Sequence, residues 1–183
     1  FDDYQKLLHD QDINSIYIST PHTSHFEFSY KALMNGKSVL CEKPLTMNSS
    51  EAMLLFNLAK KKQLLLMEAF MYRMHPQTDK IRELVQENFK GKKIEIKASF
   101  GFKANVKQDH RLLNPKLGGG SILDVGCYPL SMARLIVGLI NGKEFMDPDE
   151  YEVISEINEY GIDLSSEAKL IFLDGSSAYL ALS

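Results

Sequence analysis

Residues 38–44 have the sequence Ser-Val-Leu-Cys-Glu-Lys-Pro, a short apolar run that ends in a charged pair and a proline. A run of this length and composition predicts a buried strand. In open α/β sheets, ligands bind beyond the carboxyl ends of the strands. Because Pro44 lacks an N–H and fixes the turn, we expect it to direct Glu42 and Lys43 into such a crevice. Considered alone, the motif favours the simpler alternative of a polar strand exit.

The residues on either side of this strand, up to about residue 70, alternate between helix and strand. Apolar runs at 15–20 and 64–67 predict two more short strands. Helices are expected at 1–9, up to an Asn35-Gly36 end, and after Asn48, where Glu51 would complete a capping box. The expected core faces of the last two helices contain Phe26, Tyr30, Leu33 and Met34, and Met53, Leu54, Leu58 and Ala59. Continuously apolar strands separated by helices indicate a parallel sheet covered on both faces.

The pattern changes after residue 70. Pro76 could begin a helix, and strict alternation over 94–102 predicts a half-buried strand of an antiparallel type. A polar loop at 103–117 and a helix from Ser121 to about Ile140 follow. Three more alternating strands are expected at 151–157, 168–172 and 178–182, with a hairpin signal at Asp174-Gly175. The fold class is therefore α/β over residues 1–70 followed by α+β over residues 71–183.

Composition narrows the classes of function. The 183 residues carry a net charge of −3, which gives no basic field for nucleic acid, and no apolar run reaches membrane-spanning length. Both cysteines lie in apolar segments, so we expect reduced thiols and a cytoplasmic location. The chain begins without methionine and stops inside an alternating pattern, so we expect it to be a portion of a longer protein.

A second motif follows the polar loop. Three glycines, Gly118–Gly120, precede a helix on which Asp124 and Tyr128 lie four residues apart and should share a face. We expect the glycines to point backbone N–H groups at a substrate, and Gly126 to mark the close approach of another backbone or of a ligand. Alternatively, Asp124 is a helix-end partner and Tyr128 a core residue.

Three further polar residues are candidates for ligand binding. His22 and His25 lie at the start of a helix that follows a strand, which suits a cofactor contact; capping or a surface role is the alternative. No metal-ligand spacing links them to the cysteines, so no metal site is expected. Arg73 lies where the two parts of the chain meet and could face a ligand cleft, or form a surface salt bridge instead.

Four segments together resemble the glucose–fructose oxidoreductase/inositol dehydrogenase (Gfo/Idh/MocA) family. Residues 20–25, Thr-Pro-His-Thr-Ser-His, are similar to its T-P-x-x-x-H segment, and residues 42–44 to its E-K-P signature. Residues 118–128 resemble its G-G-G…D-x-G-x-H motif, with Tyr128 in place of histidine. That tyrosine, together with residues 68–76, resembles the branch that contains glucose–fructose oxidoreductase and the dihydrodiol and xylose dehydrogenases.

The resemblance implies the C-terminal half of a Rossmann-type parallel sheet, followed by a domain with a large, mostly antiparallel sheet through which copies associate. It implies NADP or NAD as cofactor, with NADP favoured. The implied cofactor-binding residues are Thr20, Pro21, His22, His25, Glu42, Lys43 and Arg73. The family's G-x-G-x-x-G turn is not in this sequence. The residue after the strand that follows this turn, which reads the ribose and so discriminates between NAD and NADP, is also not in this sequence.

The implied reaction is hydride transfer between a nicotinamide and the carbinol carbon of a sugar, polyol or trans-diol. Tyr128 would be the acid/base, although free tyrosine ionises only near pH ~10. Lys43 would favour the tyrosinate, and Asp124 would orient the substrate hydroxyl or Lys43. The alternatives are a non-catalytic ligand-sensing or assembly protein on the same scaffold, and a metal-dependent hydrolase, for which we find no ligands.

Overall fold

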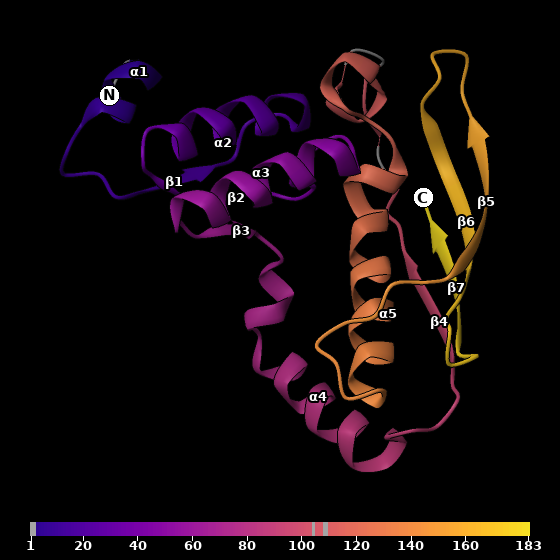
Figure 1. Cartoon of the computed structure of the whole chain (residues 1–183). Helices are drawn as coiled ribbons and strands as arrows, with labels where there is room; N and C mark the ends of the chain where they lie inside the picture. Colours follow the sequence, from indigo (N-terminus) through magenta and orange to yellow (C-terminus); the bar gives the residue numbers. More distant parts are fainter. Residues whose placement is uncertain (1–2, 104, 108–109) are drawn as a thin grey trace. The chain divides into compact units, whose positions relative to one another are not determined.

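A computed structural model describes residues 3–103, 105–107 and 110–183, and the chain divides into two compact units (Figure 1). The N-terminal unit comprises residues 1–69 together with 116–118. The C-terminal unit comprises residues 70–115 and 119–183. Each unit has its own hydrophobic cluster, so each is described separately.

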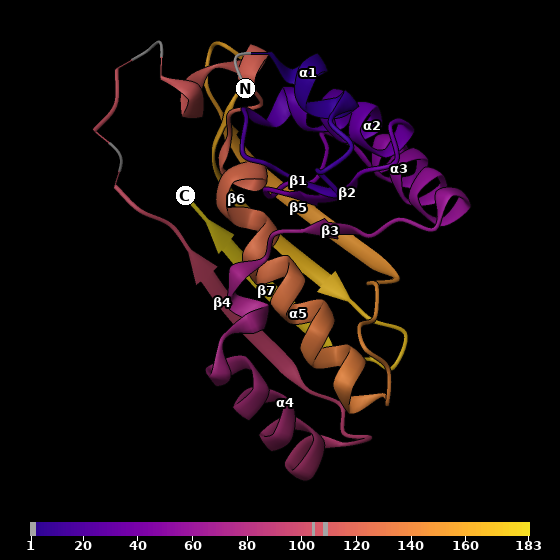
Figure 2. The ribbon, with the colours of Figure 1, turned by 90° about the vertical axis from the view of Figure 1, so that its left-hand side faces the viewer.

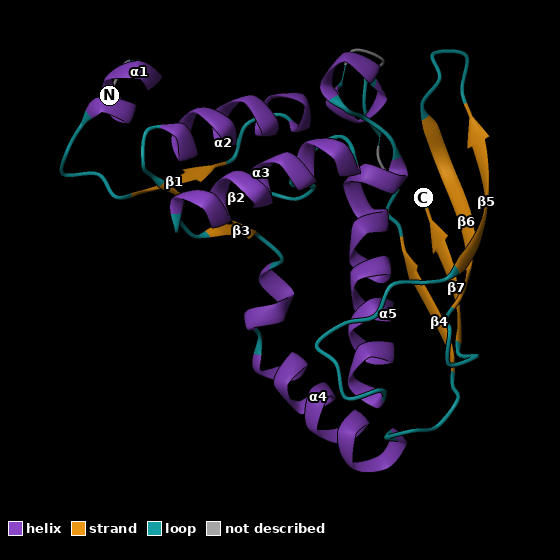
Figure 3. Cartoon of the chain, in the orientation of Figure 1, coloured by secondary structure: helices purple, strands orange, loops and turns teal. Residues whose placement is uncertain are grey.

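The N-terminal unit is a three-stranded parallel sheet with helices (Figure 3). Its elements are α1 (Tyr4–His9), β1 (Ser15–Ile18), α2 (His25–Met34), β2 (Ser38–Cys41), α3 (Ser49–Lys62) and β3 (Leu66–Glu68). The strands follow the order β1-β2-β3, which confirms the predicted parallel sheet. The register pairs Ile18 with Cys41 and Cys41 with Glu68, so the three carboxyl ends meet at one edge.

Only one face of this parallel sheet is buried in the described chain, contrary to the prediction that helices cover both. Along β1 the buried Ile16 and Ile18 alternate with exposed residues, and Tyr17 is 56% exposed. Because consecutive right-handed crossovers lead from β1 to β2 and from β2 to β3, α2 and α3 lie on the same face.

The predicted core faces of these two helices were partly wrong. In α2, Leu33 is buried, but Tyr30 and Met34 are exposed, and His25, Ser29 and Ala32 fill the core face instead. In α3, Met53 and Leu54 are exposed, whereas Leu55 and Ala59 are buried. Sequence periodicity left the choice of face open, because apolar residues occur on more than one side of each helix.

The predicted start of α3 is confirmed. The Asn48 side chain accepts a hydrogen bond from the Glu51 backbone N–H at 3.0 Å. The Glu51 carboxylate in turn accepts from the Met47 N–H at 3.2 Å. The first bond satisfies a donor that a helix start leaves free, and the second, from the residue before the N-cap, resembles the reciprocal bond of a capping box.

The C-terminal unit contains a mixed four-stranded sheet with α5 lying along one face (Figure 2). Its elements are α4 (Pro76–Phe89), β4 (Glu95–Phe100), α5 (Cys127–Ile140), β5 (Glu150–Ile157), β6 (Asp163–Ile171) and β7 (Ser177–Leu182). The strand order is β4-β7-β6-β5. The Asp174-Gly175 hairpin joins β6 and β7 as predicted, with φ +82° at Gly175. β4 was predicted to be of antiparallel type, but it pairs with β7 in parallel, since a long connection separates the two strands.

The predicted helix over 121–140 begins as a single π-turn, Ile122–Gly126, before α5 continues as an α-helix. Within the described residues, the helical stretch Pro115–Ile140 is long and apolar enough to cross a membrane by length and composition alone, which the sequence did not lead us to expect. Of its most apolar window, 56% is buried. Its residues Ala133 and Val137 pack in the core with Leu170 and Phe172, as in a core helix of a globular domain.

Candidate active site

His25 connects the two loops that leave β1 and β2. Its Nδ1 atom lies 2.7 Å from the carbonyl oxygen of Pro44, and its Nε2 atom lies 2.7 Å from that of Thr20. The imidazole is fully buried. Both loops come from the carboxyl edge of the parallel sheet, where ligands of open α/β sheets bind. His25 therefore fixes the loop that carries Lys43, and the Lys43–Pro44 peptide bond in that loop is cis.

Two carboxylates complete this edge of the N-terminal unit. Glu42 accepts a hydrogen bond from the Tyr17 hydroxyl at 2.5 Å, and this bond, with burial and the Glu42 charge, raises the pKa of Tyr17. Glu68, at the end of β3, accepts from the Leu45 N–H at 2.7 Å. The sequence analysis missed Glu68, although its position directly after the third strand was a usable signal.

His22, the other predicted histidine, packs against the segment 116–118 of the same unit. Its Nδ1 lies 2.8 Å from the Gly118 carbonyl oxygen. A Cβ on Gly118 would lie 3.0 Å from the His22 Cβ and 2.8 Å from the Met47 sulfur, and Gly118 has φ +71°. Glycine is therefore required at this position for backbone geometry and for close packing.

Cys41 lies at the end of β2 next to these loops, but it is chemically quiet. Burial raises the pKa of its thiol to about 12. At neutral pH the reactive thiolate is therefore scarce. Both Cys41 and Cys127 are free thiols, as the sequence analysis predicted.

In the C-terminal unit, the π-turn that carries Asp124 is held by side chains from distant parts of the chain. The Asp163 carboxylate accepts hydrogen bonds from the Ser121 hydroxyl at 2.8 Å and the Ile122 N–H at 2.7 Å. Arg111 donates to the buried Asp124 carboxylate at 3.1 Å. Single π-turns are rare and occur frequently at functional sites.

Two of the three glycines before the π-turn, Gly119 and Gly120, do not present free N–H groups, contrary to the prediction. The Gly119 N–H donates to the Asn114 carbonyl at 3.1 Å, and the Gly120 N–H donates to the Leu112 carbonyl at 3.0 Å. A Cβ on Gly126 would lie 2.6 Å from a terminal methyl of Leu182. Gly126 therefore accommodates a core side chain rather than a backbone or a ligand.

Tyr128 lies in a cluster of aromatic rings. Its ring centroid is 5.6 Å from that of Phe70, 6.2 Å from that of Tyr72 and 5.4 Å from that of Phe100. Three edge-on or tilted neighbours fix the plane of the ring. The cluster joins the start of α5 to the end of β4 and to the 3₁₀ turn Met71–Met74.

Arg73 and His75 both have structural partners. Arg73 donates to the Ser131 hydroxyl at 2.8 Å, within the C-terminal unit. The His75 Nδ1 accepts from the Gln77 N–H at 3.1 Å and caps α4, which begins at Pro76 as predicted. The expected role of Arg73 with a cofactor stays a prediction.

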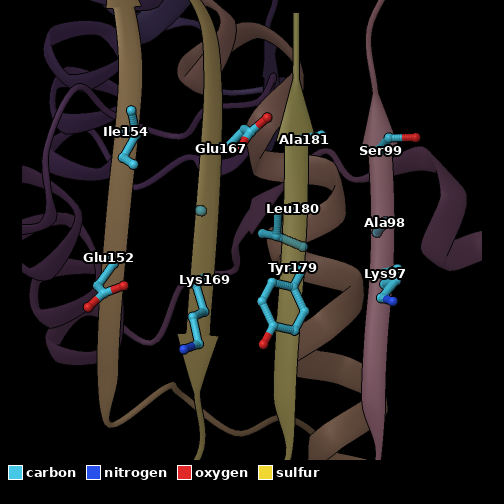
Figure 4. A pocket seen from close by; sticks show the side chains of 11 residues that line it. Lys97, Ala98, Ser99, Glu152, Ile154, Glu167, Lys169, Tyr179, Leu180 and Ala181 are labelled. Carbon is cyan, nitrogen blue, oxygen red and sulfur yellow. The ribbon is translucent and has the colours of Figure 1, made fainter.

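Two of the hollows on the C-terminal unit lie beside the π-turn and over the four-stranded sheet. A cavity of about 320 Å³ beside the π-turn has Asp124 and Asp163 in its lining, with apolar walls that include Phe102, Leu112 and Leu164. A shallow groove of about 420 Å³ runs over the sheet; its lining includes Lys97, Glu152, Glu167 and Lys169 (Figure 4).

The predicted site residues are thus divided between the units. Thr20, Pro21, His22, His25, Glu42 and Lys43 belong to the N-terminal unit, and Arg73, Asp124 and Tyr128 to the C-terminal unit. The exposed Thr20 and Pro21 and the half-buried Glu42 and Lys43 lie at the carboxyl edge of a parallel sheet, which fits the binding of a dinucleotide.

A parallel sheet of this kind, joined to a unit with a mixed sheet, defines a Rossmann-type oxidoreductase scaffold. Residues 1–70 match the family model described as "Oxidoreductase family, NAD-binding Rossmann fold", and residues 78–144 match the "GFO/IDH/MocA C-terminal domain". The chain belongs to the Gfo/Idh/MocA family, which confirms the family that the sequence motifs indicated.

The curated relatives agree with the predicted branch. The chain is 35% identical over 176 residues to D-xylose 1-dehydrogenase (NADP(+)) 2 of Haloferax volcanii, covering 96% of this chain and 51% of that protein. It is 33% identical over 178 residues to trans-1,2-dihydrobenzene-1,2-diol dehydrogenase of Xenopus tropicalis, covering 97% and 52%. The chain thus spans about half the length of the curated relatives it matches.

Solved structures share the fold. KijD10, a 3-ketoreductase from Actinomadura kijaniata in complex with NADP and TDP-benzene, superposes with a TM-score of 0.80 at 31% identity, over 98% of this chain and 53% of that one. Aldose-aldose oxidoreductase from Caulobacter crescentus gives a TM-score of 0.85 at 22% identity, over 100% and 54%, which is evidence for the fold alone.

Proposed function

We propose that the protein is an NAD(P)-dependent oxidoreductase that transfers hydride between a nicotinamide and the carbinol carbon of a sugar, polyol or trans-diol. The observation that carries this proposal is Tyr128, a phenol held by three rings at the start of α5, directly after a π-turn with a buried carboxylate. A fixed phenol is suited to exchange a proton with a substrate hydroxyl.

The relatives support the assignment of Lys43 and Tyr128. Structures of KijD10 have been determined with one tyrosine changed to phenylalanine and with one lysine changed to alanine or to glutamate. Those two positions are separated by nearly the same number of residues as Lys43 and Tyr128. We therefore propose Lys43, Asp124 and Tyr128 as the catalytic residues.

For the cofactor we propose NADP, with NAD as the alternative, because the D-xylose dehydrogenases among the relatives carry NADP(+) in their names. Thr20, Pro21, His22, Glu42 and Lys43 would hold it at the strand ends, the buried His25 would position the loops that carry them, and Arg73 is a further candidate. When bound, the nicotinamide accepts or gives the hydride.

The chain's own residues would manage the proton. During oxidation the hydroxyl proton of the substrate passes to the Tyr128 oxygen as the carbon loses its hydride, and during reduction the proton returns. Lys43 would favour the tyrosinate by its charge. Asp124, buried and paired with Arg111, would accept a hydrogen bond from a substrate hydroxyl or orient Lys43.

The test is Tyr128→Phe in the full natural polypeptide, with Tyr30→Phe as a matched control on α2. We expect kcat to fall by about 10²- to 10⁴-fold, the contribution typical of a general acid/base, with the dinucleotide Kd unchanged. Tyr30→Phe should leave both constants unchanged. Wild-type turnover by Tyr128→Phe would remove Tyr128 from the mechanism.

We also propose that two copies associate through the outer face of the four-stranded sheet, and that the protein is cytoplasmic. This face carries both signs of charge, Lys97 and Lys169 with Glu152 and Glu167, around the strongly exposed Ile154 (Figure 4). A two-fold axis can bring unlike charges of such a face together. Ile154→Asp should convert the assembly to monomers in sedimentation experiments, whereas Leu173→Asp, at an equally exposed hairpin residue, should not. An assembly that Ile154→Asp leaves intact would place the interface elsewhere.

A further inference from the structure

The partners of Arg73 are unusual for an arginine. Its guanidinium donates to the Ser131 hydroxyl at 2.8 Å, and its Nε lies 3.5 Å from the Tyr72 hydroxyl, at the limit of a hydrogen bond. The Tyr72 hydroxyl donates to the same Ser131 oxygen at 2.9 Å. The guanidinium carbon also lies 5.7 Å from the centre of the Phe70 ring.

None of these partners carries a negative charge. Among the described residues, Arg111 and Arg134 differ from this arrangement, because Arg111 pairs with Asp124 and Arg134 pairs with Asp147. Arginine stays protonated in proteins, so the positive charge of Arg73 is permanent. Because neutral oxygens and a ring hold it, that charge acts on its surroundings without a carboxylate to offset it.

Tyr128 lies next to this charge. Ser131 follows Tyr128 by three residues on α5, so the two side chains are neighbours on one face of the helix. Phe70 touches both groups, because its ring packs against Tyr128 at 5.6 Å and lies under Arg73. The Tyr72 ring, which carries the hydroxyl next to Arg73, packs against Tyr128 at 6.2 Å.

Among the described residues, the rings that pack against Tyr128 come from two other elements of the unit. β4 contributes the Phe100 ring, and the 3₁₀ turn contributes the Phe70 and Tyr72 rings besides Arg73. On the helical stretch itself, Asp124 precedes Tyr128 by four residues, and Arg111 already pairs with its carboxylate. Arg73 is thus a permanent positive charge on one of these elements, and it favours a negative Tyr128 oxygen.

We propose that Arg73, anchored by Ser131 and Tyr72, is a positioning residue that favours the tyrosinate form of Tyr128. This inference rests on the proposed function of Tyr128 as acid/base. Arg73 would then be a second cation that acts on Tyr128, besides Lys43. Arg73 belongs to the same unit as Tyr128, so this effect needs no bound substrate or cofactor.

The proposed role affects the two directions of the reaction differently. Oxidation requires the tyrosinate, which accepts the hydroxyl proton, and reduction requires the protonated phenol, which gives it back. Neutralising Arg73 therefore raises the apparent pKa of Tyr128 in both directions. Oxidation then becomes slower at neutral pH, whereas reduction extends to higher pH.

The experiment compares Arg73→Gln, Arg73→Lys and the control Arg134→Gln in the full natural polypeptide, with kcat/KM measured against pH in both directions. For Arg73→Gln we expect both profiles to move about one pH unit toward alkaline, the lower end of the effect of a nearby charge. Below the shifted pKa, oxidation should fall roughly ten-fold while reduction is maintained. Arg73→Lys should stay near the wild-type profile, and Arg134→Gln should be indistinguishable from it.

A second readout needs no turnover. The ultraviolet absorbance of tyrosinate, titrated against pH and compared with the Tyr128→Phe variant, reports the ionisation of Tyr128 directly. Arg73→Gln should move this titration upward, and Ser131→Ala, which removes the anchor, should move it in the same direction by less. If Arg73→Gln does not fold, Ser131→Ala carries the test.

Several results would overturn the inference. Equal losses in both directions with unmoved pH profiles would make Arg73 a structural residue. A weaker dinucleotide Kd with unmoved profiles would make it a cofactor contact instead. Failure of the proposed function is distinct from both, because Tyr128→Phe would then keep full turnover whatever Arg73 does.

Discussion

The two units hold their candidate functional residues in different ways. In the N-terminal unit, Lys43 lies in a loop fixed by His25, a residue 19 positions from Pro44. In the C-terminal unit, the π-turn and Tyr128 depend on residues much farther along the chain. Asp163 binds Ser121 from 42 positions away, and Arg73 binds Ser131 from 58 positions away. The loop that carries Lys43 is therefore held by a residue close in the sequence, whereas the start of α5, like His22 with its partner Gly118, 96 positions away, depends on distant segments.

The largest expected effect concerns His25. His25→Ala leaves the carbonyl oxygens of Thr20 and Pro44 without their partner and opens a cavity. We expect a loss of about 3 kcal/mol in the free energy of unfolding. His25→Asn retains a hydrogen-bond donor, so its free energy of unfolding should fall by less. Chemical denaturation of the natural polypeptide, combined with segment-resolved hydrogen exchange, measures both.

His75→Asn is the matched control for His25, because asparagine is a favourable N-cap and His75 only caps α4. It should change the free energy of unfolding by less than about 0.5 kcal/mol. If His25→Ala changed the free energy of unfolding as little as this control, the two loops would be held by other contacts. His25 would then not explain how the N-terminal unit positions Lys43.

The next effect concerns Asp163. Asp163→Ala removes both hydrogen bonds that hold the start of the π-turn, and we expect a loss of about 1 to 2 kcal/mol. Because Asp124 lies two residues beyond Ile122, kcat should fall more than dinucleotide affinity. Asp163→Asn keeps an acceptor oxygen and should recover much of the stability. A variant with normal kcat would show that the π-turn forms without this clamp.

The units should also differ at alkaline pH. Burial raises the pKa of Tyr4 and of Cys41, both in the N-terminal unit, to about 12. For acids whose folded pKa is raised, the stabilisation is complete below the ordinary values of 9.0 and 10.0 and disappears as pH rises through the folded values. The N-terminal unit should therefore open between about pH 9 and 12.

Alkylation of Cys41, followed in a Cys127→Ala background, measures that opening. We expect Cys41 to react slowly at pH 8 and then much faster as the unit opens. Rapid alkylation at pH 8 would mean that the thiol is not protected by the fold.

The smallest effect lies on the acid side of the C-terminal unit. Burial alone would raise the pKa of Asp174, but hydrogen bonds from Asn141 and Ser176 outweigh it and lower that pKa. Because the folded pKa is lowered, the stabilisation is present at neutral pH and disappears as pH falls through the folded value. Asp174→Asn should therefore weaken the β6–β7 hairpin slightly at pH 7 and leave it unchanged at strongly acidic pH. Equal destabilisation at both pH values would show that the negative charge of Asp174 does not stabilise the hairpin.

The same contrast explains what the sequence could predict. β2 was predicted at its observed bounds and α3 with its Asn48 cap, because both depend on neighbouring residues. The parallel pairing of β4 with β7, the π-turn and the clamp by Asp163 were not predicted. Each depends on contacts between distant segments, and no local pattern records them.

Candidate site residues followed the same rule. Glu42, Lys43, Asp124 and Tyr128 were identifiable because they stand in short motifs. Glu68 was missed although it follows the predicted third strand, and Asp163 was missed because a single acidic residue at the start of a strand carries no pattern. The prediction that Gly119 and Gly120 have free N–H groups was wrong, because the carbonyl oxygens of Asn114 and Leu112 accept their hydrogen bonds.

The proposed oxidoreductase function depends most directly on dinucleotide binding. NADPH and NADH should be titrated into the full natural polypeptide while nicotinamide fluorescence is followed. We predict saturable binding of a reduced nicotinamide dinucleotide, tighter for NADPH, which Tyr128→Phe leaves unchanged. Absence of binding by either nucleotide would contradict the oxidoreductase account and favour a non-catalytic protein that retains this scaffold.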